Sequence, residues 1–212
     1  ENFGVSRTVV RESIKSLVAK GLIVTGPKLG TRVLSEDQWN WFDPDVVSWL
    51  SQKRLSADFL RDLQELRRIV EPAAIRLAAE RATTRELTSI EVAFSGMKNA
   101  VENGGDYVTH DLRFHQGLLQ ASGNRLLVQM SKVLGALLRT SFEISTAKKN
   151  GPAQSLSMHR DVLDAVIARD PNRAEAAILR LIDGAKQDIE SVLSSRRRIP
   201  NIGRPASPLR AL

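Results

Sequence analysis

Residues 3–23, FGVSRTVVRESIKSLVAKGLI, combine a candidate helix cap, basic side chains and an apolar stripe. Ser6 is a suitable N-cap because its hydroxyl can accept a hydrogen bond from an otherwise unpaired backbone N–H. Gly21 can end the helix, since glycine adopts the left-handed conformation common after a last helical turn. Between them the apolar residues recur at helical spacing, namely Val9, Val10, Ile14, Leu17 and Val18. The pattern predicts one basic, amphipathic helix over residues 6–20.

The next segment, LIVTGPKLGTRVL at residues 22–34, predicts a β-hairpin. Apolar and β-branched residues stand on both sides of a Gly-Pro-Lys-Leu-Gly turn. A basic helix followed by a basic hairpin is typical of a winged helix-turn-helix, and we assign residues 1–35 to such a module.

The net charge of +7 is concentrated at the two ends of the chain. Residues 1–34 contain six basic and two acidic side chains, and residues 195–212 contain five arginines and no acid. The middle of the chain, with 20 basic and 22 acidic side chains, is nearly neutral. This distribution favours contact between the N-terminal module and a polyanion.

The sequence after residue 55 predicts an all-helical domain at 56–195. Local caps support its helix boundaries: Ser56, a capping box formed by Thr83 and Glu86, and Asp170 before Pro171. The predicted helices are 56–82, 84–102, 105–121, 125–148, 153–169 and 171–195, and Pro72 is expected to bend the first of them. The predicted fold class is therefore mostly α, a winged helix-turn-helix followed by an all-α helical bundle.

Two further segments complete the division of the chain. Residues 36–55 contain all three tryptophans and predict a connector that ends in a short helix, while residues 196–212 predict a basic, mobile tail. The absence of cysteine excludes disulfides and thiolate metal sites. No apolar run approaches the roughly 20 residues that cross a bilayer. We therefore expect a cytoplasmic protein with no membrane partner.

The basic helix can be interpreted as a DNA-reading element. A helix fits the major groove with its first turns toward the base edges, which makes Arg7, Thr8 and Arg11 the base-facing candidates. The candidates for phosphate contacts are Ser6 at the helix N-terminus and Lys28 and Arg32 on the hairpin. The alternative is that this surface is merely a solvated basic face.

Asp111 and His115 stand four residues apart and therefore project from one face of a predicted helix, and His159 lies in a later helix. Converging in a helical bundle, these side chains could bind a divalent cation such as Zn²⁺, Ni²⁺ or Mn²⁺. His110 lies about 100° around the same helix and is expected to point elsewhere. By spacing alone, histidines on the surface or in hydrogen bonds remain the alternative.

Arg67 and Arg139 are the candidates for binding an anion. Each follows an apolar helical pattern, and an arginine embedded in such a face needs an anionic partner. That partner is either a ligand carboxylate or an internal Glu, such as Glu71 or Glu143. Gln120 and Asn124 are further candidates, for contacts to ligand hydroxyl groups.

Several motifs together resemble one family. FGVSRTVVRESIKSLVAKGLI followed by GTRV resembles the recognition helix and wing of GntR-family transcription factors. ELRRIVEPAAIRLAAERAT, DLRFHQGLLQASGN and HRDVLDAVIARD resemble the all-helical (FCD-type) effector domain of the FadR-like branch. The resemblance covers nearly the whole chain up to about residue 193.

The resemblance implies a homodimeric, ligand-responsive regulator of transcription, a repressor of sugar-acid catabolism that binds operator DNA. It implies an effector that is a small carboxylate, an aldonate such as galactonate, and a carboxylate-binding role for Arg67 in the ELR motif. It also implies an Asp–His–His–His metal site in which Asp111, His115 and His159 match the first three positions. Leu181 stands where the fourth ligand is expected.

The resemblance also implies one helix and most of a second before residue 3, so we expect the winged helix to be truncated. Without those helices the apolar face of the basic helix would lack a partner. The alternatives are a regulator of the same family that responds to another organic acid, a metal-dependent hydrolase of a small carboxylate, and a dimeric scaffold without a ligand. The chain contains no H-E-x-x-H, no G-x-S-x-G and no phosphate loop, so we expect no enzyme.

Overall fold

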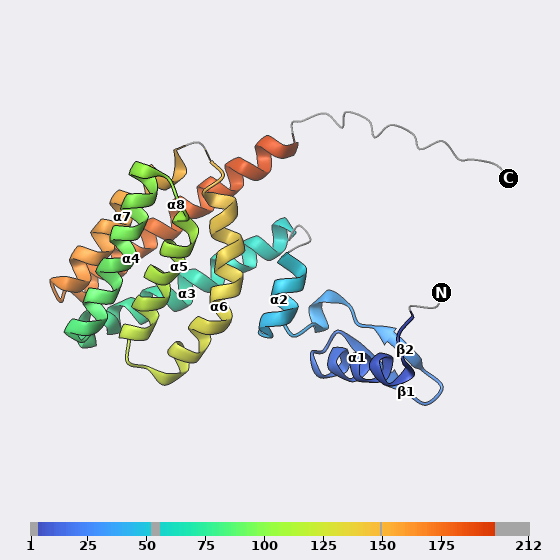
Figure 1. The fold of residues 1–212 in the computed structure, drawn as a ribbon. Helices are drawn as coiled ribbons and strands as arrows, with labels where there is room; N and C mark the ends of the chain where they lie inside the picture. Colours follow the sequence, from blue (N-terminus) through green and yellow to red (C-terminus); the bar gives the residue numbers. More distant parts are fainter. Residues whose placement is uncertain (1–3, 52–55, 149, 198–212) are drawn as a thin grey trace.

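The computed structural model describes residues 4–51, 56–148 and 150–197 (Figure 1). The N-terminal module consists of α1 (Arg7–Ala19), β1 (Ile23–Gly26) and β2 (Gly30–Val33). A short 3-10 helix, η1 (Glu36–Gln38), and α2 (Pro44–Ser51) follow it. The helical domain contains α3 (Ala57–Arg81), α4 (Thr84–Asn103), α5 (Tyr107–Ala121), α6 (Arg125–Ser145), α7 (Gly151–Ile167) and α8 (Pro171–Arg197).

The N-terminal module has the predicted helix and hairpin. The Ser6 hydroxyl accepts a hydrogen bond from the backbone N–H of Val9 at 3.3 Å, and Gly21 follows α1 with φ of 69°. β1 and β2 are antiparallel, with Ile23 opposite Val33 and Gly26 opposite Gly30. None of the residues of α1, all of which are described, is buried. Val9, Val10 and Val18 are exposed, and Ile14 and Leu17 are only partly buried.

The helices of the C-terminal domain begin and end close to the predicted residues because the predicted caps form. Ser56 accepts from the N–H of Phe59, and Thr83 and Glu86 make the reciprocal capping box. The largest differences lie between α6 and α7. α6 ends at Ser145 rather than at 148, and α7 begins at Gly151, directly after Asn150 in the left-handed conformation.

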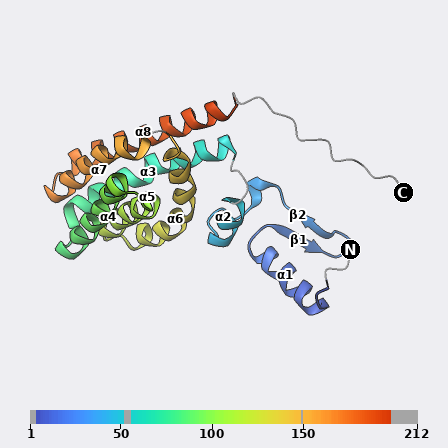
Figure 2. The same cartoon turned by 45° about the horizontal axis from the view of Figure 1, so that its top comes forward.

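α3 is the central helix of this domain and packs against α8, α5 and α7 (Figures 1 and 2). One apolar core joins α3, α4, α5, α7 and α8, with Phe114, Leu118 and Ile178 fully buried in it. A second core joins α2, α3 and α6 around Leu134 and Leu138. Between these two cores the domain contains a set of buried polar side chains.

The connector fastens the N-terminal module to the helical domain. Lys20, at the end of α1, donates hydrogen bonds to the carboxylates of Asp43 and Asp45 at the start of α2. Val47 of α2 is buried in the core it shares with α6, and the ring of Trp41 lies 4.4 Å from that of Phe59 on α3. α2 thus lies between the two parts of the chain (Figure 1).

Two predicted regions fall wholly or partly outside the described residues. These are the end of the connector at 52–55 and the tail at 196–212, of which only the continuation of α8 to Arg197 is described. No helix among the described residues is long and apolar enough to cross a membrane.

Candidate metal and carboxylate site

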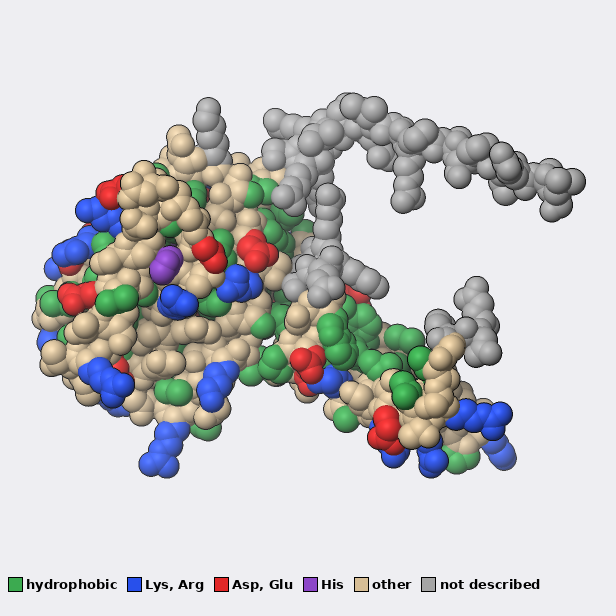
Figure 3. Space-filling model, viewed as in Figure 1, with side chains coloured by type: hydrophobic (Ala, Val, Ile, Leu, Met, Phe, Trp, Pro, Cys, Tyr) green, Lys and Arg blue, Asp and Glu red, His purple; other side chains and the backbone are tan. Residues whose placement is uncertain are grey.

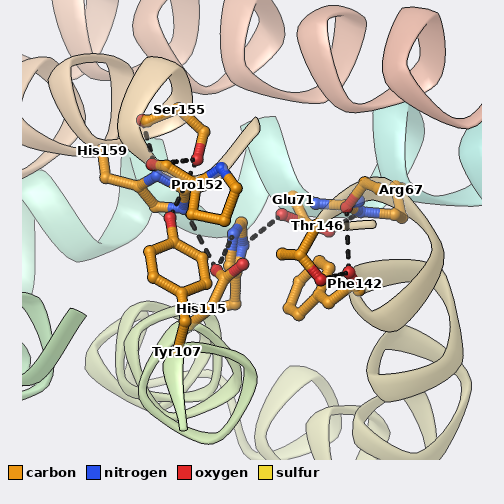
Figure 4. A network of polar contacts seen from close by, with 11 residues as sticks. Arg67, Glu71, Tyr107, His115, Phe142, Thr146, Pro152, Ser155 and His159 are labelled. Atoms are coloured by element: carbon orange, nitrogen blue, oxygen red, sulfur yellow. Dashed lines mark hydrogen bonds and ion pairs between the residues drawn. The ribbon is translucent and has the colours of Figure 1, made fainter. Parts of the chain in front are cut away.

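The buried polar side chains surround a small cavity between α3, α5, α6, α7 and α8 (Figure 4). Arg67 comes from α3, Asp111 and His115 from α5, and His159 from α7. The cavity leaves about 20 Å³ for the centres of water molecules. That volume suits one or two waters, or a metal ion.

Asp111, His115 and His159 come together as the sequence predicted. All three are buried, and their ligand atoms lie within 4.8 Å of one another. Nε2 of His159 lies 3.1 Å from Oδ1 of Asp111, and Nε2 of His115 lies 3.4 Å from the same oxygen. Two donors that are each about 2.1 Å from one ion, at an angle of about 90–109°, lie about 3.0–3.4 Å apart. The two distances to Asp111 fit a small divalent cation, and the two histidine donors lie within 4.8 Å of each other.

The other ring nitrogen of each histidine has a buried acceptor. Nδ1 of His115 lies 2.8 Å from Oε2 of Glu71, and Nδ1 of His159 lies 2.8 Å from the backbone carbonyl of Ser155. Because a carboxylate and a carbonyl only accept, Nδ1 donates in both contacts. This fixes both rings with Nε2 toward Asp111, which is the arrangement found around metal-binding histidines.

Glu71 is the second buried carboxylate of the site. Its Oε1 accepts a hydrogen bond from Nε of Arg67 at 2.7 Å, and both side chains are only 1% exposed. Burial alone would raise the pKa of Glu71, but the charges of Arg67 and His115 and their hydrogen bonds lower the pKa to about 2. Glu71 is therefore ionised. The sequence predicted Glu71 only as a partner of Arg67, because its contact with His115 joins residues 44 positions apart.

Arg67 lies in this cavity wall, with its guanidinium 5.0 Å from the centre of the Phe142 ring. Its Nη1 atom is buried and has no hydrogen-bond partner among the described residues. A buried donor without a partner is costly, so this atom is a candidate binding point for an acceptor that enters the cavity. Arg67 therefore pairs with Glu71, the internal partner that the sequence offered, and its contact with a ligand carboxylate stays a prediction.

Ser155 and Tyr107 were not predicted as part of the site. The Tyr107 hydroxyl lies 2.8 Å from Oγ of Ser155, which itself donates to the carbonyl of Pro152. Burial and the nearby charge of Asp111 raise the pKa of Tyr107, so its hydroxyl stays protonated. These contacts hold the first turn of α7, from which the Ser155 carbonyl reaches His159 (Figure 4).

Leu181 of α8 is buried and lines the cavity together with the three candidate ligands. It has no atom that binds a cation. The site therefore has three candidate ligands on one side and an apolar side chain at the position where the family resemblance places a fourth.

Three predicted effector contacts do not line this cavity. Arg139 is exposed rather than embedded in an apolar face, because it projects from the outer side of α6 and donates to Oγ1 of Thr109. Asn124 is the N-cap of α6 and accepts from the N–H groups of Leu126 and Leu127. Gln120 is exposed at the end of α5. His110 packs against Gly96 of α4, away from the cavity, as expected from its position.

The predicted DNA-facing side chains lie at the surface of the N-terminal module. Arg7, Thr8 and Arg11 are exposed along α1, and Lys28 and Arg32 are exposed on the hairpin. Figure 3 shows Lys and Arg side chains along the outer edge of this module. The Ser6 hydroxyl caps α1 and fixes the helix start, and a phosphate contact at this helix N-terminus stays a prediction.

Comparison with known proteins agrees with this architecture. Residues 1–33 match the model for bacterial regulatory proteins of the gntR family, and residues 62–184 match the model for the FCD domain. The chain is 34% identical to the galactonate operon transcriptional repressor of Escherichia coli strain K12, over 91% of this chain and 84% of the relative. It is 32% identical to the transcriptional regulator LutR of Bacillus subtilis strain 168, over 92% of this chain and 87% of the relative.

A solved structure, McbR/YncC of E. coli, shares the fold with a TM-score of 0.59 at 18% identity, over 92% of this chain and 84% of that chain. The matching families and relatives are transcription regulators and not enzymes. The winged helix, the all-helical domain and these matches lead to one conclusion: the chain is a transcription regulator that belongs to the GntR family and carries an FCD domain.

Proposed function

We propose that this regulator is a repressor whose helical domain binds a small carboxylate, an aldonate such as galactonate, beside a divalent metal ion. The observation that carries the proposal is one cavity between the helices, lined by three buried candidate metal ligands and by Arg67, whose buried Nη1 has no hydrogen-bond partner among the described residues. A cation at Asp111, His115 and His159 would supply positive charge and open coordination positions for a carboxylate oxygen. The 34% identity to a galactonate operon repressor supports the choice of acid.

Arg7, Thr8 and Arg11 on α1 would contact base edges of the operator, and Lys28 and Arg32 would contact phosphates. Two copies of the chain would bind two half-sites as a homodimer, which requires a fixed separation of the two winged helices.

The size of the cavity suggests how the effector would act. A sugar acid is several times larger than the one or two waters that fit there, so binding it requires its walls to move. α6 contributes Phe142 and Ser145 to the wall and packs against α2, which is joined to the end of α1 through the ion pair of Lys20 with Asp43. Movement of α6 would therefore change the position of the N-terminal module and weaken operator binding.

The test uses the full chain and a DNA site selected from random duplexes. We expect galactonate to weaken binding to this DNA in the presence of Zn²⁺, Ni²⁺ or Mn²⁺, and to do so much less after chelation. Galactose, which has the same hydroxyl groups but no carboxylate, is the matched control. Unchanged DNA affinity at saturating galactonate would contradict the proposed effector.

A smaller organic acid is the second candidate, because the cavity would need less opening to admit it. Measuring DNA binding with lactate in place of galactonate distinguishes the two candidate acids. A response to lactate without a response to galactonate would select the smaller acid and retain the rest of the proposal.

A further inference from the structure

Glu71 contacts two different functional groups with its two oxygens. Oε1 accepts from Nε of Arg67 at 2.7 Å, and Oε2 lies 2.8 Å from Nδ1 of His115. A carboxylate that only balanced Arg67 would need no second contact. Here one rigid, buried group links the candidate anion-binding side chain to a candidate metal ligand across α3 and α5 (Figure 4).

We infer that Glu71 is a positioning residue that couples the binding of the metal ion to the binding of the carboxylate. The inference rests on the proposed function of this cavity. Glu71 holds Nδ1 of His115 protonated, which leaves the lone pair of Nε2 for the cation. It also holds the guanidinium of Arg67 by Nε, so that Nη1 remains free for an entering carboxylate.

The buried charges favour joint binding. In a cation-bound site the histidines bind as neutral imidazoles, so Arg67 with one positive charge and the carboxylates of Glu71 and Asp111 with one negative charge each sum to about −1. Asp188, at the edge of the cavity, is balanced by Lys148. A divalent cation changes the sum to about +1, and a monocarboxylate then returns it to about zero. Since uncompensated charge is costly in a buried site, each ligand favours the other, and a monocarboxylate fits better than a dicarboxylate.

The test measures the affinity of the full chain for Zn²⁺ by competition with a fluorescent chelator, with and without galactonate or lactate. We expect Glu71→Gln to weaken Zn²⁺ binding by about 10–100-fold, the range for residues that orient a metal ligand. We also expect the carboxylate to tighten Zn²⁺ binding in the natural chain and to have little effect in this variant. Glu80→Gln, at an exposed position of the same helix, is the matched control.

Glu71→Gln leaves Arg67 buried without its counter-ion and could unfold the protein. A second variant therefore removes both charges. Glu71→Gln combined with Arg67→Met removes both charges and keeps similar side-chain volumes. If Glu71 positions His115, the double variant folds with a helical circular dichroism spectrum but still binds Zn²⁺ weakly. Zn²⁺ affinity within threefold of the natural chain in this folded double variant would overturn the inference.

The effect of the carboxylate on Zn²⁺ affinity tests the coupling separately. If Glu71→Gln reduces Zn²⁺ affinity but the carboxylate tightens Zn²⁺ binding equally in both proteins, the coupling role is wrong. These measurements need no operator DNA, so their outcome is separate from a failure of galactonate to release DNA. A metal–carboxylate coupling that depends on Glu71 would support the inference even if another acid proved to be the effector.

Discussion

The N-terminal module and the helical domain use arginine in opposite ways. Arg7 and Arg11 on α1 are exposed, and no ion pair that involves them is found among the described residues. Arg67 on α3 is 1% exposed and is fixed by Glu71. The first arrangement keeps a charge available for a large polyanion at little structural cost. In the second arrangement the buried charge selects its ligand, because a ligand that does not balance the charges of the site can enter only at a cost in free energy.

The largest effect expected from this contrast is on stability. Arg67→Ala leaves the Glu71 carboxylate buried without its main counter-ion, and breaking a buried pair in this way costs about 3–5 kcal/mol. Arg61→Ala on the same helix removes an exposed pair with Asp58, which is worth at most about 0.5 kcal/mol. Urea unfolding of both variants measures the difference. Equal stability of the two variants would remove the distinction between the buried and the exposed arginines.

Removal of a candidate ligand tests the cavity separately from the N-terminal module. We expect His159→Ala to weaken Zn²⁺ binding by at least about 100-fold, more than a change in a residue that only orients a ligand. His110→Ala is the control, because His110 points away from the cavity. Chelator competition measures both. DNA binding without effector should stay close to that of the natural chain, and equal Zn²⁺ affinity in the two variants would contradict the ligand assignment.

Arg11→Ala should weaken DNA binding and leave the stability of the chain nearly unchanged. Loss of one good base contact costs about 1–3 kcal/mol of operator binding. Stability should change by less than about 0.5 kcal/mol, since the side chain is exposed. Fluorescence anisotropy with selected and random DNA measures the first quantity and urea unfolding the second. A variant that bound selected DNA as tightly as before would exclude Arg11 from base recognition.

Leu181→His tests whether the apolar side chain at this position limits the affinity of the site for a metal ion. Leu181 lines the cavity beside the three candidate ligands, so a histidine there would add a fourth nitrogen donor. We expect Zn²⁺ to bind about tenfold more tightly and the carboxylate to shift the melting temperature less, because one open coordination position is lost. Leu181→Met controls for the change in packing. A histidine variant with unchanged Zn²⁺ affinity would place the cation away from α8.

The smallest effect concerns the link between the two regions. Partial burial of Asp43 would raise its pKa, but hydrogen bonds from Lys20 and from the backbone of Val46 and Asp45 lower it. The pKa of Lys20 is raised by its hydrogen bonds to Asp45 and Asp43. The contribution of this pair is thus present between the two ordinary pKa values of 3.8 and 10.5.

The contribution is lost as pH falls through the lowered pKa of Asp43 or rises through the raised pKa of Lys20. We therefore expect Lys20→Met to reduce stability at pH 7 and to reduce it less near pH 3. Chemical unfolding at the two pH values measures this. An equal effect at both values would mean that Lys20 acts through its cation–π contact with Trp49, which persists at low pH, instead of through its ion pairs with Asp43 and Asp45.

Local features of the sequence were sufficient for the helices and for one half of the site. Capping by Ser6, Ser56 and Thr83 involves residues at most three positions apart, so it can be predicted without a fold. The same holds for the common face of Asp111 and His115 and for the pairing of Arg67 with Glu71, because both pairs are four residues apart. The prediction that Arg139 is embedded in an apolar face is wrong, because a helical period indicates an apolar face but not what covers it.

The sequence by itself therefore determined the mostly helical fold, the basic N-terminal module and the candidate ligands. Only the tertiary structure decided that His159 faces Asp111, that Glu71 joins Arg67 to His115, and that Leu181 lines the cavity. The physical reason is the separation along the sequence of the residues that interact. Caps and helix faces depend on backbone geometry over one turn, whereas this site forms where five helices pack together and bury charges from distant parts of the chain.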